Sequence, residues 1–385
     1  MAALESSQVP EPTDIVSFQF TSGTTGEPKA SMSTHINFLN NARFLGQRMH
    51  LRPEDIVCCP PPLFHCFGLV MGFLSVLIHG ATIVFPSDHF DAGRVLDAVN
   101  QERCTTLLGV PTMFAAELEL IESKGYSVTS LRKGLVAGSP VFPSMMDSLQ
   151  KHMGIEDMVI SYGMTETGPI TFCTTLEDST RYRATTVGKV MPHIAARVVD
   201  AKGRVLLRGE RGELCISGYA LHKGYLNNQV KTDEVMTVAE DGAVWMHTGD
   251  ECLIDDDGYC QVLGRIKDII IRGGENIYPK EIEEHLQQHP DITEASVVGV
   301  PDTKYGEVVA CFLRAVDEDR APDVEDVRGW VQKKMGRSKT PQYVFWVGSK
   351  QACSHIPQTG SGKHQKNLLR DIASKLLKRS GDFSA

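Results

Sequence analysis

The sequence lacks the cysteine spacings that mark a structural zinc site or a thioredoxin-like redox motif. Its ten cysteines include no Cys-x-x-Cys pair; Cys58 and Cys59 are adjacent, and the others are scattered through apolar segments. Zinc-binding domains and dithiol enzymes need closely spaced pairs. We therefore expect reduced, mostly buried thiols, as in proteins of an intracellular compartment.

An excess of positive charge is also missing. The 385 residues contain 39 Lys and Arg against 48 Asp and Glu, which gives a formal net charge of −9 at pH 7. Binding to nucleic acid or to an anionic membrane depends on basic surfaces. Neither is expected here, so any phosphate recognition must be local.

No segment has the pattern of a membrane span or a signal peptide. Residues 56–87 contain no Asp, Glu, Lys or Arg, but three prolines (60–62) open the stretch and Gly80 divides it. Neither piece is long enough to cross a bilayer. The first 13 residues are polar, and the chain ends in Phe-Ser-Ala rather than in a peroxisomal Ser-Lys-Leu. We expect a cytoplasmic protein, with a peroxisomal or mitochondrial form as the alternative if the N-terminus is incomplete.

Helix-like and strand-like segments alternate through the first two-thirds of the chain. Residues 105–110 are typical of a buried strand and precede a predicted helix at 112–123. Short apolar runs at 135–137 and 158–160 are each followed by a loop, and 67–79 suits a short buried helix. This alternation predicts an α/β sheet with functional loops at the strand ends.

From about residue 187 the pattern changes to short strands and turns. Residues 195–199, 204–207 and 212–217 are typical of a meander, and 252–254 with 259–263 of a β-hairpin. We therefore expect a β-rich subdomain after the α/β sheet.

The final third has its own pattern of helices and strands. It predicts helices at 279–288 and 324–335 and strands at 297–300 and 308–316. The predicted fold is an α/β large domain with a β-rich subdomain (1–266) followed by a small α+β C-terminal domain (267–385).

Nine consecutive residues near the N-terminus have the composition of a phosphate-binding loop. Glycines let backbone N–H groups approach an anion closely, and hydroxyls and lysine add donors and charge. The segment is not a Walker A loop, because no Gly-Lys-Ser/Thr ending is present; a polar surface turn is the alternative. The nine residues are Thr21, Ser22, Gly23, Thr24, Thr25, Gly26, Glu27, Pro28 and Lys29.

A second cluster of polar residues follows the apolar run at 158–160. Tyr162 can stack on a base, the hydroxyl of Thr165 can meet phosphate oxygens, and the carboxylate of Glu166 can hold Mg²⁺. The alternative is an N-capping turn.

Further candidates are weak when taken one by one. His65 lies in the charge-free stretch, where a core histidine is the more common case. Asp250 is placed at a strand end, where an acidic residue can accept both hydroxyls of a ribose, although turn aspartates are common. Lys363 lies in a glycine-rich loop near the C-terminus, where most lysines are merely solvated.

The order and spacing of these segments resemble the adenylate-forming superfamily, which includes acyl-CoA synthetases, luciferases and peptide-synthetase adenylation domains. The matching motifs run from Thr21 to Lys363. Within the superfamily, Tyr-Gly-Met-Thr-Glu (162–166) and Gly-Gly-Glu-Asn-Ile-Tyr-Pro (273–279) look most like medium-chain acyl-CoA synthetases and coumarate-CoA ligases.

The resemblance implies an acid–thiol ligase that uses ATP, Mg²⁺ and CoA. Such an enzyme joins a carboxylic acid, here a medium-chain fatty or aryl acid, to AMP and then transfers the acyl group to CoA. The alternatives are a truncated paralogue that binds a nucleotide or a partner without turnover, and another adenylate-forming enzyme such as a luciferase-like protein.

The resemblance also implies a role for each motif. Thr165 would contact the α-phosphate, Glu166 would hold Mg²⁺, and Lys363 would be catalytic in the adenylation step. The residues implied to bind ATP are Thr21, Ser22, Gly23, Thr24, Thr25, Gly26 and Lys29 at the β- and γ-phosphates, Ser139 and Pro140 beside the adenine, Tyr162 on the base, and Asp250 and Arg265 at the ribose.

Two further groups of residues are implied by the same resemblance. His65, Val110 and Gly163 would line the carboxylate pocket. Lys267 would be the hinge about which the C-terminal domain rotates, and that rotation would present the loop of Gly273, Gly274 and Glu275 for thioester formation.

This chain departs from the pattern of the superfamily in the segment before the phosphate loop. Members of the superfamily carry a sizeable subdomain before the phosphate loop, whereas only twenty residues precede it here. We therefore expect a large domain truncated at its N-terminus, with apolar surface exposed where the missing part would pack.

Overall fold

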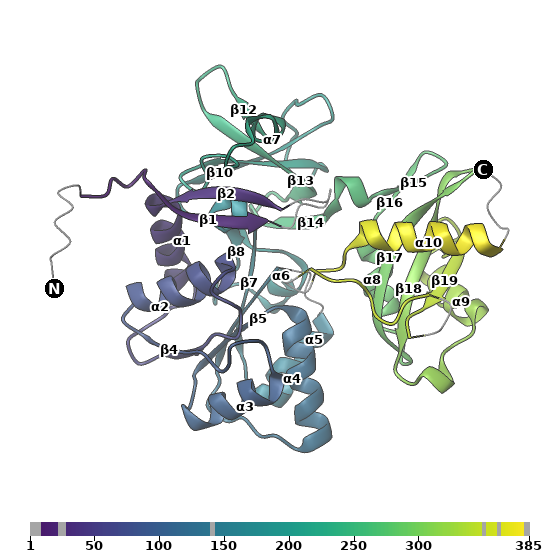
Figure 1. The fold of residues 1–385 in the computed structure, drawn as a ribbon, viewed down its shortest axis with the longest axis horizontal. Coiled ribbons are helices and arrows are strands. Elements are labelled where there is room, and N and C mark those ends of the chain that lie inside the picture. The colour runs from purple at the N-terminus through teal and green to yellow at the C-terminus, as the bar shows by residue number, and fades with distance from the viewer. Residues whose placement is uncertain (1–8, 22–27, 139–142, 349–351, 360–362, 381–385) are drawn as a thin grey trace. The chain divides into compact units, whose positions relative to one another are not determined.

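The computed structural model of this chain describes residues 9–21, 28–138, 143–348, 352–359 and 363–380 (Figure 1). The chain divides into two compact units. The first comprises Met1–Thr248 and Leu253–Gln261, and the second Gly249–Cys252 and Val262–Ala385. Among the described residues, no helix combines the length and the apolar character that crossing a membrane requires.

A seven-stranded sheet organises the first unit, in the order β4-β3-β5-β6-β7-β8-β9. Strands β4, β3, β5, β6 and β7 run parallel, whereas β8 and β9 are antiparallel additions. Because β5 and β6 are buried along their whole length, they read as continuous apolar runs rather than alternating ones. The strands are β3 (Ile56–Cys58), β4 (Thr82–Val84), β5 (Thr106–Gly109), β6 (Lys133–Ala137), β7 (Asp157–Gly163), β8 (Ile170–Cys173) and β9 (Lys189–Val190).

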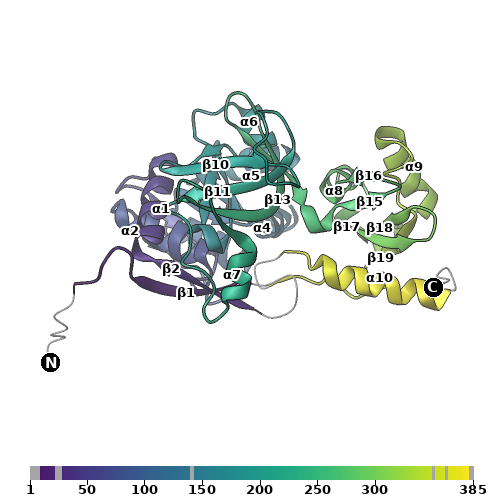
Figure 2. The ribbon, with the colours of Figure 1, turned by 90° about the horizontal axis from the view of Figure 1, so that it is seen from above.

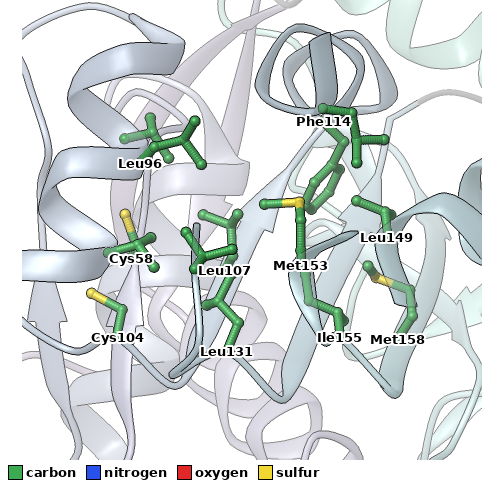
Figure 3. Packing of buried hydrophobic residues seen from close by; sticks show 14 of the residues in the cluster. Cys58, Leu96, Cys104, Leu107, Phe114, Leu131, Leu149, Met153, Ile155 and Met158 are labelled. Atoms are coloured by element: carbon green, nitrogen blue, oxygen red, sulfur yellow. The ribbon is translucent and has the colours of Figure 1, made fainter. Parts of the chain in front are cut away.

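Three helices supply much of the core beside this sheet. They are α3 (Ala92–Gln101), α4 (Pro111–Lys124) and α5 (Pro143–Met153), and α4 lies between the other two. Figure 3 shows Phe114 of α4 and Leu149 and Met153 of α5 pointing toward one another, all fully buried. The predicted α/β fold is confirmed.

A second helical group consists of α1 (His35–Arg48), a π-helix η1 (Phe67–Leu74) and its continuation α2 (Ser75–Ile78). The helix predicted at 67–79 is therefore present, but its first half is wound as a π-helix. Glycines allow it to approach its neighbours closely: a Cβ on Gly68 would lie 2.3 Å from the carbonyl oxygen of Pro62, and one on Gly72 2.5 Å from the sulfur of Cys59.

The carboxylate of Asp55 is fully buried at the amino ends of three parallel strands. It accepts hydrogen bonds from Arg132 Nη2 (2.6 Å), just before β6, and from Lys133 Nζ (3.0 Å), the first residue of that strand. It also accepts from Thr105 Oγ1 (3.0 Å), just before β5, and from the backbone N–H of Arg52 (3.0 Å). Burial alone would raise the pKa of Asp55, but Lys133 and the other donors outweigh it and leave the pKa below its ordinary value.

A β-rich sheet follows, in the order β10-β11-β13-β12 with β14 on β13. The predicted hairpin around residue 257 is confirmed as β13–β14. The strand predicted at 204–207 is wrong: Val205 makes only an isolated bridge to Val199, and Asp200 turns the chain by accepting from the backbone N–H groups of Lys202 and Arg204. The strands are β10 (Ile194–Val199), β11 (Gly212–Gly218), β12 (Met236–Val238), β13 (Val244–Ile254) and β14 (Cys260–Arg265).

A two-stranded antiparallel hairpin, β1 (Ile15–Thr21) and β2 (Lys29–Thr34), carries the predicted phosphate loop. The loop residues Ser22, Gly23, Thr24, Thr25 and Gly26 lie outside the described residues, and their role in binding phosphate stays a prediction. Apolar side chains of β1 are exposed, with Phe18 at 49% and Phe20 at 70%.

The second unit is built on the sheet β16-β15-β18-β17, with β19 parallel to β18. Alternate residues of β17 and β18 face two cores: Val297 packs with α8 and α9, whereas Val298 packs with α10. Figure 2 shows α8 and α9 on one face of this sheet and α10 on the other. The elements are α8 (Pro279–Leu286), α9 (Val324–Met335), α10 (Lys366–Ser380), β15 (Ile270–Arg272), β16 (Glu275–Ile277), β17 (Ile292–Asp302), β18 (Gly306–Ala315) and β19 (Tyr343–Trp346).

The predicted α+β character of this unit is confirmed, including the helices expected near 279 and 324. The remaining short helices of the chain are α6 (Thr180–Thr185), α7 (Gln229–Val235) and the 3₁₀ turns η2 (Thr165–Thr167), η3 (Ile266–Asp268) and η4 (Glu318–Arg320).

The Asp55 cluster generates a stability prediction. Replacing Asp55 with Asn leaves Lys133 without its buried counter-charge, which we expect to lower the free energy of unfolding by about 3 kcal/mol at pH 7. Because the folded-state pKa of Asp55 is lowered, its contribution is present above its unfolded-state pKa of about 4 and is lost as the pH falls through the folded-state value.

Urea unfolding followed by circular dichroism between pH 7 and pH 3 measures both effects. Asp233→Asn, at an exposed aspartate of α7, is the matched control. A loss no larger than that of the control would show that Asp55 does not hold the strands together.

Candidate active site

The loops after the parallel strands meet at one edge of the sheet, because the carboxyl ends of parallel strands lie together. Val110 follows β5 and Gly138 follows β6; a Cβ on Gly138 would lie 3.4 Å from Val110 Cγ1. Cys66, in the segment after β3, has its sulfur 3.7 Å from Thr165 Oγ1, which follows β7. Segments that are separated by about 100 positions are thus side by side.

His65 and Val110, two of the predicted pocket residues, belong to this edge. His65 is half-buried, and its Nδ1 accepts from the backbone N–H of Phe67 at 3.1 Å, at the start of η1. Val110 is 8% exposed and caps the N-terminus of α4, where Pro111 begins the helix. Ser139 and Pro140, predicted to border the adenine, lie outside the described residues.

Gly163 has a structural reason to be glycine. A Cβ at this position would lie 1.8 Å from the carbonyl oxygen of Pro169, the residue just before β8, which pairs with β7. The close approach of these two backbone segments therefore requires a residue without a side chain at position 163. Next to it, the ring of Tyr162 lies 6.4 Å from that of Phe172. The predicted contact of Gly163 with the carboxylic acid substrate and that of Tyr162 with the adenine stay predictions.

Glu166 is held by a residue that the sequence analysis did not single out. Its carboxylate is on η2 and the residue is only 5% exposed. Tyr225 donates its hydroxyl to Glu166 Oε1 at 2.8 Å, across 59 positions of sequence. The phenol thus fixes the orientation of one carboxylate oxygen in a nearly dry environment.

Tyr225 in turn belongs to a segment that pairs with β2. The backbone N–H of Leu226 donates to the carbonyl oxygen of Ala30 at 2.8 Å, and Met32 donates to Gly224 at 3.0 Å. Lys29 Nζ lies over the Tyr225 ring, 4.4 Å from its centroid. The lysine of the predicted phosphate loop and the predicted magnesium carboxylate therefore contact the same aromatic side chain.

His222 is a second neighbour that the sequence did not indicate. Its Nδ1 lies 2.8 Å from the hydroxyl of Ser31, and its ring meets Tyr225 edge-on at 4.9 Å. Burial, with a smaller effect of Lys29, lowers the pKa of His222 to about 4. The imidazole is therefore neutral at pH 7 and adds no charge to the site.

A groove of about 430 Å³ opens beside these residues. Two lysines, Lys29 and Lys231, lie on its walls, so its charge suits an anion. Its lining consists of Phe20, Pro28, Lys29, Ala30, Tyr225, Leu226, Asn228 and Lys231.

Asp250 and Arg265, the predicted ribose ligands, form an ion pair. Asp250 lies inside β13 and not at a strand end as predicted, because the strand continues to Ile254. Arg265 Nε lies 2.7 Å from Asp250 Oδ1, and the Asp250 side chain is only 6% exposed. The pair joins the adjacent strands β13 and β14 within the second unit. A structural ion pair alone would explain this geometry, so ribose binding stays a prediction.

The predicted hinge residue, Lys267, lies in η3. Burial lowers its pKa, against the opposing charge of Asp268. Arg370 of α10 donates to the carbonyl oxygen of Lys267 at 3.3 Å and to Asp268 Oδ1 at 2.9 Å. Helix α10 is thus hydrogen-bonded, through Arg370, to the segment predicted to act as the hinge.

The predicted thioester loop is a tight turn between β15 and β16. Gly273 and Gly274 have φ angles of +59° and +87°, and Arg272 pairs with Glu275. Two positive φ angles define the two-residue turn that favours glycine. The glycines are therefore explained by the hairpin, and their role in thioester formation stays a prediction.

Lys363 lies three residues before α10. Its backbone N–H donates to Thr359 Oγ1 at 3.2 Å, and its carbonyl oxygen accepts from the Thr359 N–H at 2.8 Å. Gln358 and His364 form a bridge on either side of this pair. The backbone of the predicted catalytic lysine is thus anchored, whereas its side chain is exposed.

Within the part of the chain that the structure describes, one group of metal-ligand residue types lies on the β-rich sheet. Glu213, Cys215 and His247 converge on the β-rich sheet, where His247 Nδ1 lies 2.8 Å from Glu213 Oε2. Burial raises the pKa of the Cys215 thiol to about 12, so it keeps its proton at neutral pH. We interpret this group as a polar contact between strands.

Comparison with known proteins defines the family. The family model "AMP-binding enzyme" matches residues 2–226, and "AMP-binding enzyme C-terminal domain" matches residues 281–363. The chain belongs to the AMP-binding enzymes, which confirms the resemblance seen in the sequence.

Curated relatives and a solved structure agree with this membership. The chain is 52% identical to acyl-CoA ligase sidI of Aspergillus fumigatus over 95% of its length. It is 41% identical to medium-chain acyl-CoA ligase ACSF2, mitochondrial, of Danio rerio over 94% of its length. The ATP-bound structure of MatB from Rhodopseudomonas palustris superposes with a TM-score of 0.82 at 30% identity, covering 94% of this chain and 69% of that one.

The chain is shorter than these relatives. It spans 62% of the Aspergillus fumigatus ligase and 59% of the Danio rerio ligase. Their activities therefore enter below only as proposals for this chain.

The Tyr225–Glu166 contact generates a binding prediction. Tyr225→Phe removes the donor to a nearly buried carboxylate, and a hydrogen bond to a charged group contributes about 1.5–3 kcal/mol. We expect the affinity for ATP in the presence of Mg²⁺ to fall about 10-fold, and much less without Mg²⁺.

Titration calorimetry with and without Mg²⁺ makes the measurement. Tyr182→Phe removes a hydroxyl from the exposed contact with Asp257 and is the control. Equal losses with and without the metal would mean that Tyr225 does not act through Glu166.

Proposed function

We propose that this chain adenylates a carboxylic acid with ATP and then transfers the acyl group to CoA, with a medium-chain fatty or aryl acid as substrate. The observation that carries the proposal is the contact of Glu166 and Lys29 with the same side chain, Tyr225. It combines a fixed carboxylate and a cation beside the strand that leaves the predicted phosphate loop. Membership of the AMP-binding enzymes supports it.

Glu166 suits a magnesium ion, because Mg²⁺ prefers oxygen ligands and this carboxylate is already oriented by Tyr225. A magnesium ion held there would neutralise charge on the phosphates. Lys29 would add a positive charge on the same side, and Thr165 would donate to the α-phosphate.

The remaining contacts with the nucleotide are proposed for Asp250, Arg265 and Tyr162. Asp250 would accept from the ribose hydroxyls, with Arg265 fixing its carboxylate at 2.7 Å. Tyr162 would stack on the adenine. The acid would lie near His65, Val110 and Gly163, where the nearly buried Val110 provides an apolar wall.

Lys363 is proposed as the catalytic residue of adenylation. Attack of a carboxylate on the α-phosphate builds negative charge, and an ammonium group against it lowers the barrier. We further propose that residues 1–266 and 267–385 act as separate domains that rotate about Lys267. The loop of Gly273, Gly274 and Glu275 would then serve thioester formation.

The compartment is a proposal of the same kind. We propose a cytoplasmic location for this chain. The name of the Danio rerio relative places that protein in mitochondria, so organelle fractionation of a tagged chain would decide between the two.

Pyrophosphate exchange into ATP tests the proposed function. We expect the purified chain to catalyse exchange with medium-chain or aryl acids, and Lys363→Ala to lower it by at least about 100-fold. Thioester formation from supplied acyl-adenylate should change little in the same variant.

Lys375→Ala, at an exposed lysine of α10, is the matched control. Absence of exchange with every acid of a broad panel would reject the ligase proposal. Equal loss of both steps in Lys363→Ala would reject the two-step use of the C-terminal domain.

A further inference from the structure

A glutamate of the second unit contacts both of two paired segments, Gln358–Thr359 and Lys363–His364, which we call the turn. Glu294 lies on β17, and its Oε1 accepts from Gln358 Nε2 at 3.2 Å and from His364 Nε2 at 3.0 Å. Facing a carboxylate, the His364 ring must donate through Nε2. Gln358 and His364 are the two residues that bridge across the turn.

The orientation of Glu294 is itself fixed. Arg314 stands opposite it on β18, and Arg314 Nε lies 3.1 Å from Glu294 Oε2. One carboxylate oxygen is thus used by the sheet and the other by the turn. The side chains of Glu294 and His364 are 21% and 20% exposed, so water competes weakly for these contacts.

The charges agree with this arrangement. Burial alone would raise the pKa of Glu294, but hydrogen bonds from His364 and Arg314 outweigh it and leave the pKa below its ordinary value. The carboxylate is therefore ionised at neutral pH, and its bonds to the turn are of the stronger, charge-assisted kind.

We propose that Glu294 is a positioning residue for Lys363: by holding Gln358 and His364 together, it fixes the backbone from which the lysine extends. The proposal rests on the catalytic role proposed for Lys363. It predicts that Glu294 matters for adenylation and not for thioester formation, since only the first step uses that lysine.

Glu294→Gln is the informative change, because an amide has one oxygen and one NH₂ group. Arg314 stays charged and takes the amide oxygen, so the NH₂ group faces the donors Gln358 and His364. Loss of a charge-assisted contact predicts about 10-fold faster hydrogen exchange at the backbone amides of Lys363 and Gln365, the amides that close the turn.

Hydrogen exchange with mass spectrometry tests the turn without any need for enzymatic activity. Glu325→Gln is the matched control, since Glu325 pairs with Arg328 on the exposed surface of α9. The inference is overturned if exchange in the turn is the same in Glu294→Gln as in the control.

The two half-reactions then separate positioning from a general structural role. We expect pyrophosphate exchange to fall about 10-fold in Glu294→Gln, with thioester formation from supplied acyl-adenylate within about 2-fold of wild type. Equal loss of both steps would also overturn the inference. If wild type shows no pyrophosphate exchange, the proposed function fails, while the hydrogen-exchange result still decides whether Glu294 holds the turn.

A second variant covers the case in which Glu294→Gln does not fold. His364→Leu removes one donor and leaves β17 and Arg314 intact. It should give the same faster exchange at Lys363 and the same selective loss of adenylation. Unchanged exchange in His364→Leu would show that the contact with Glu294 does not fix the turn.

Discussion

The buried carboxylate of Asp55 sets the geometry on which the first unit depends. Asp55 immediately precedes β3, and its carboxylate accepts hydrogen bonds from Thr105 before β5 and from Arg132 and Lys133 at the start of β6. Because these strands are short and parallel, fixing their amino ends also helps to bring their carboxyl ends to the same opposite edge. A buried ion pair is a weak source of stability but a strong source of register, because leaving one partner unpaired is costly.

The candidate site has a similar logic, in which one side chain satisfies several distant segments. Tyr225 contacts Glu166 through its hydroxyl and Lys29 through its ring. Its own segment pairs with β2 through backbone hydrogen bonds, which fix the backbone of Tyr225 beside the hairpin. In the second unit Glu294 has the same function for the turn around Lys363. The chemistry proposed for both places would thus depend on neighbours that carry no motif of their own.

The sequence predicted the sheet and the family but not these neighbours. Apolar runs such as β5 are local patterns, and the spacing of Thr165 and Glu166 is a motif, so both can be read from the chain. Tyr225 is 59 positions from Glu166, and no local periodicity connects them. The strand expected at 204–207 failed because the Asp200 turn, a side-chain effect, overrode β propensity. The Gly273–Gly274 turn was recognised as glycine-rich, yet its hairpin depends on pairing with strands that lie farther along the chain.

The burial of the cysteines has a practical consequence for studying motion in this protein. Nine of the ten free thiols are buried, and Cys353 alone is half-buried. A thiol reacts only when it is both exposed and deprotonated. Alkylation of the nine buried cysteines therefore requires the chain to open locally. Each cysteine is therefore a built-in probe of local unfolding: its rate of alkylation measures how often the region around it opens. Cys66, beside Thr165, would measure this at the edge of the sheet where the nucleotide is proposed to bind.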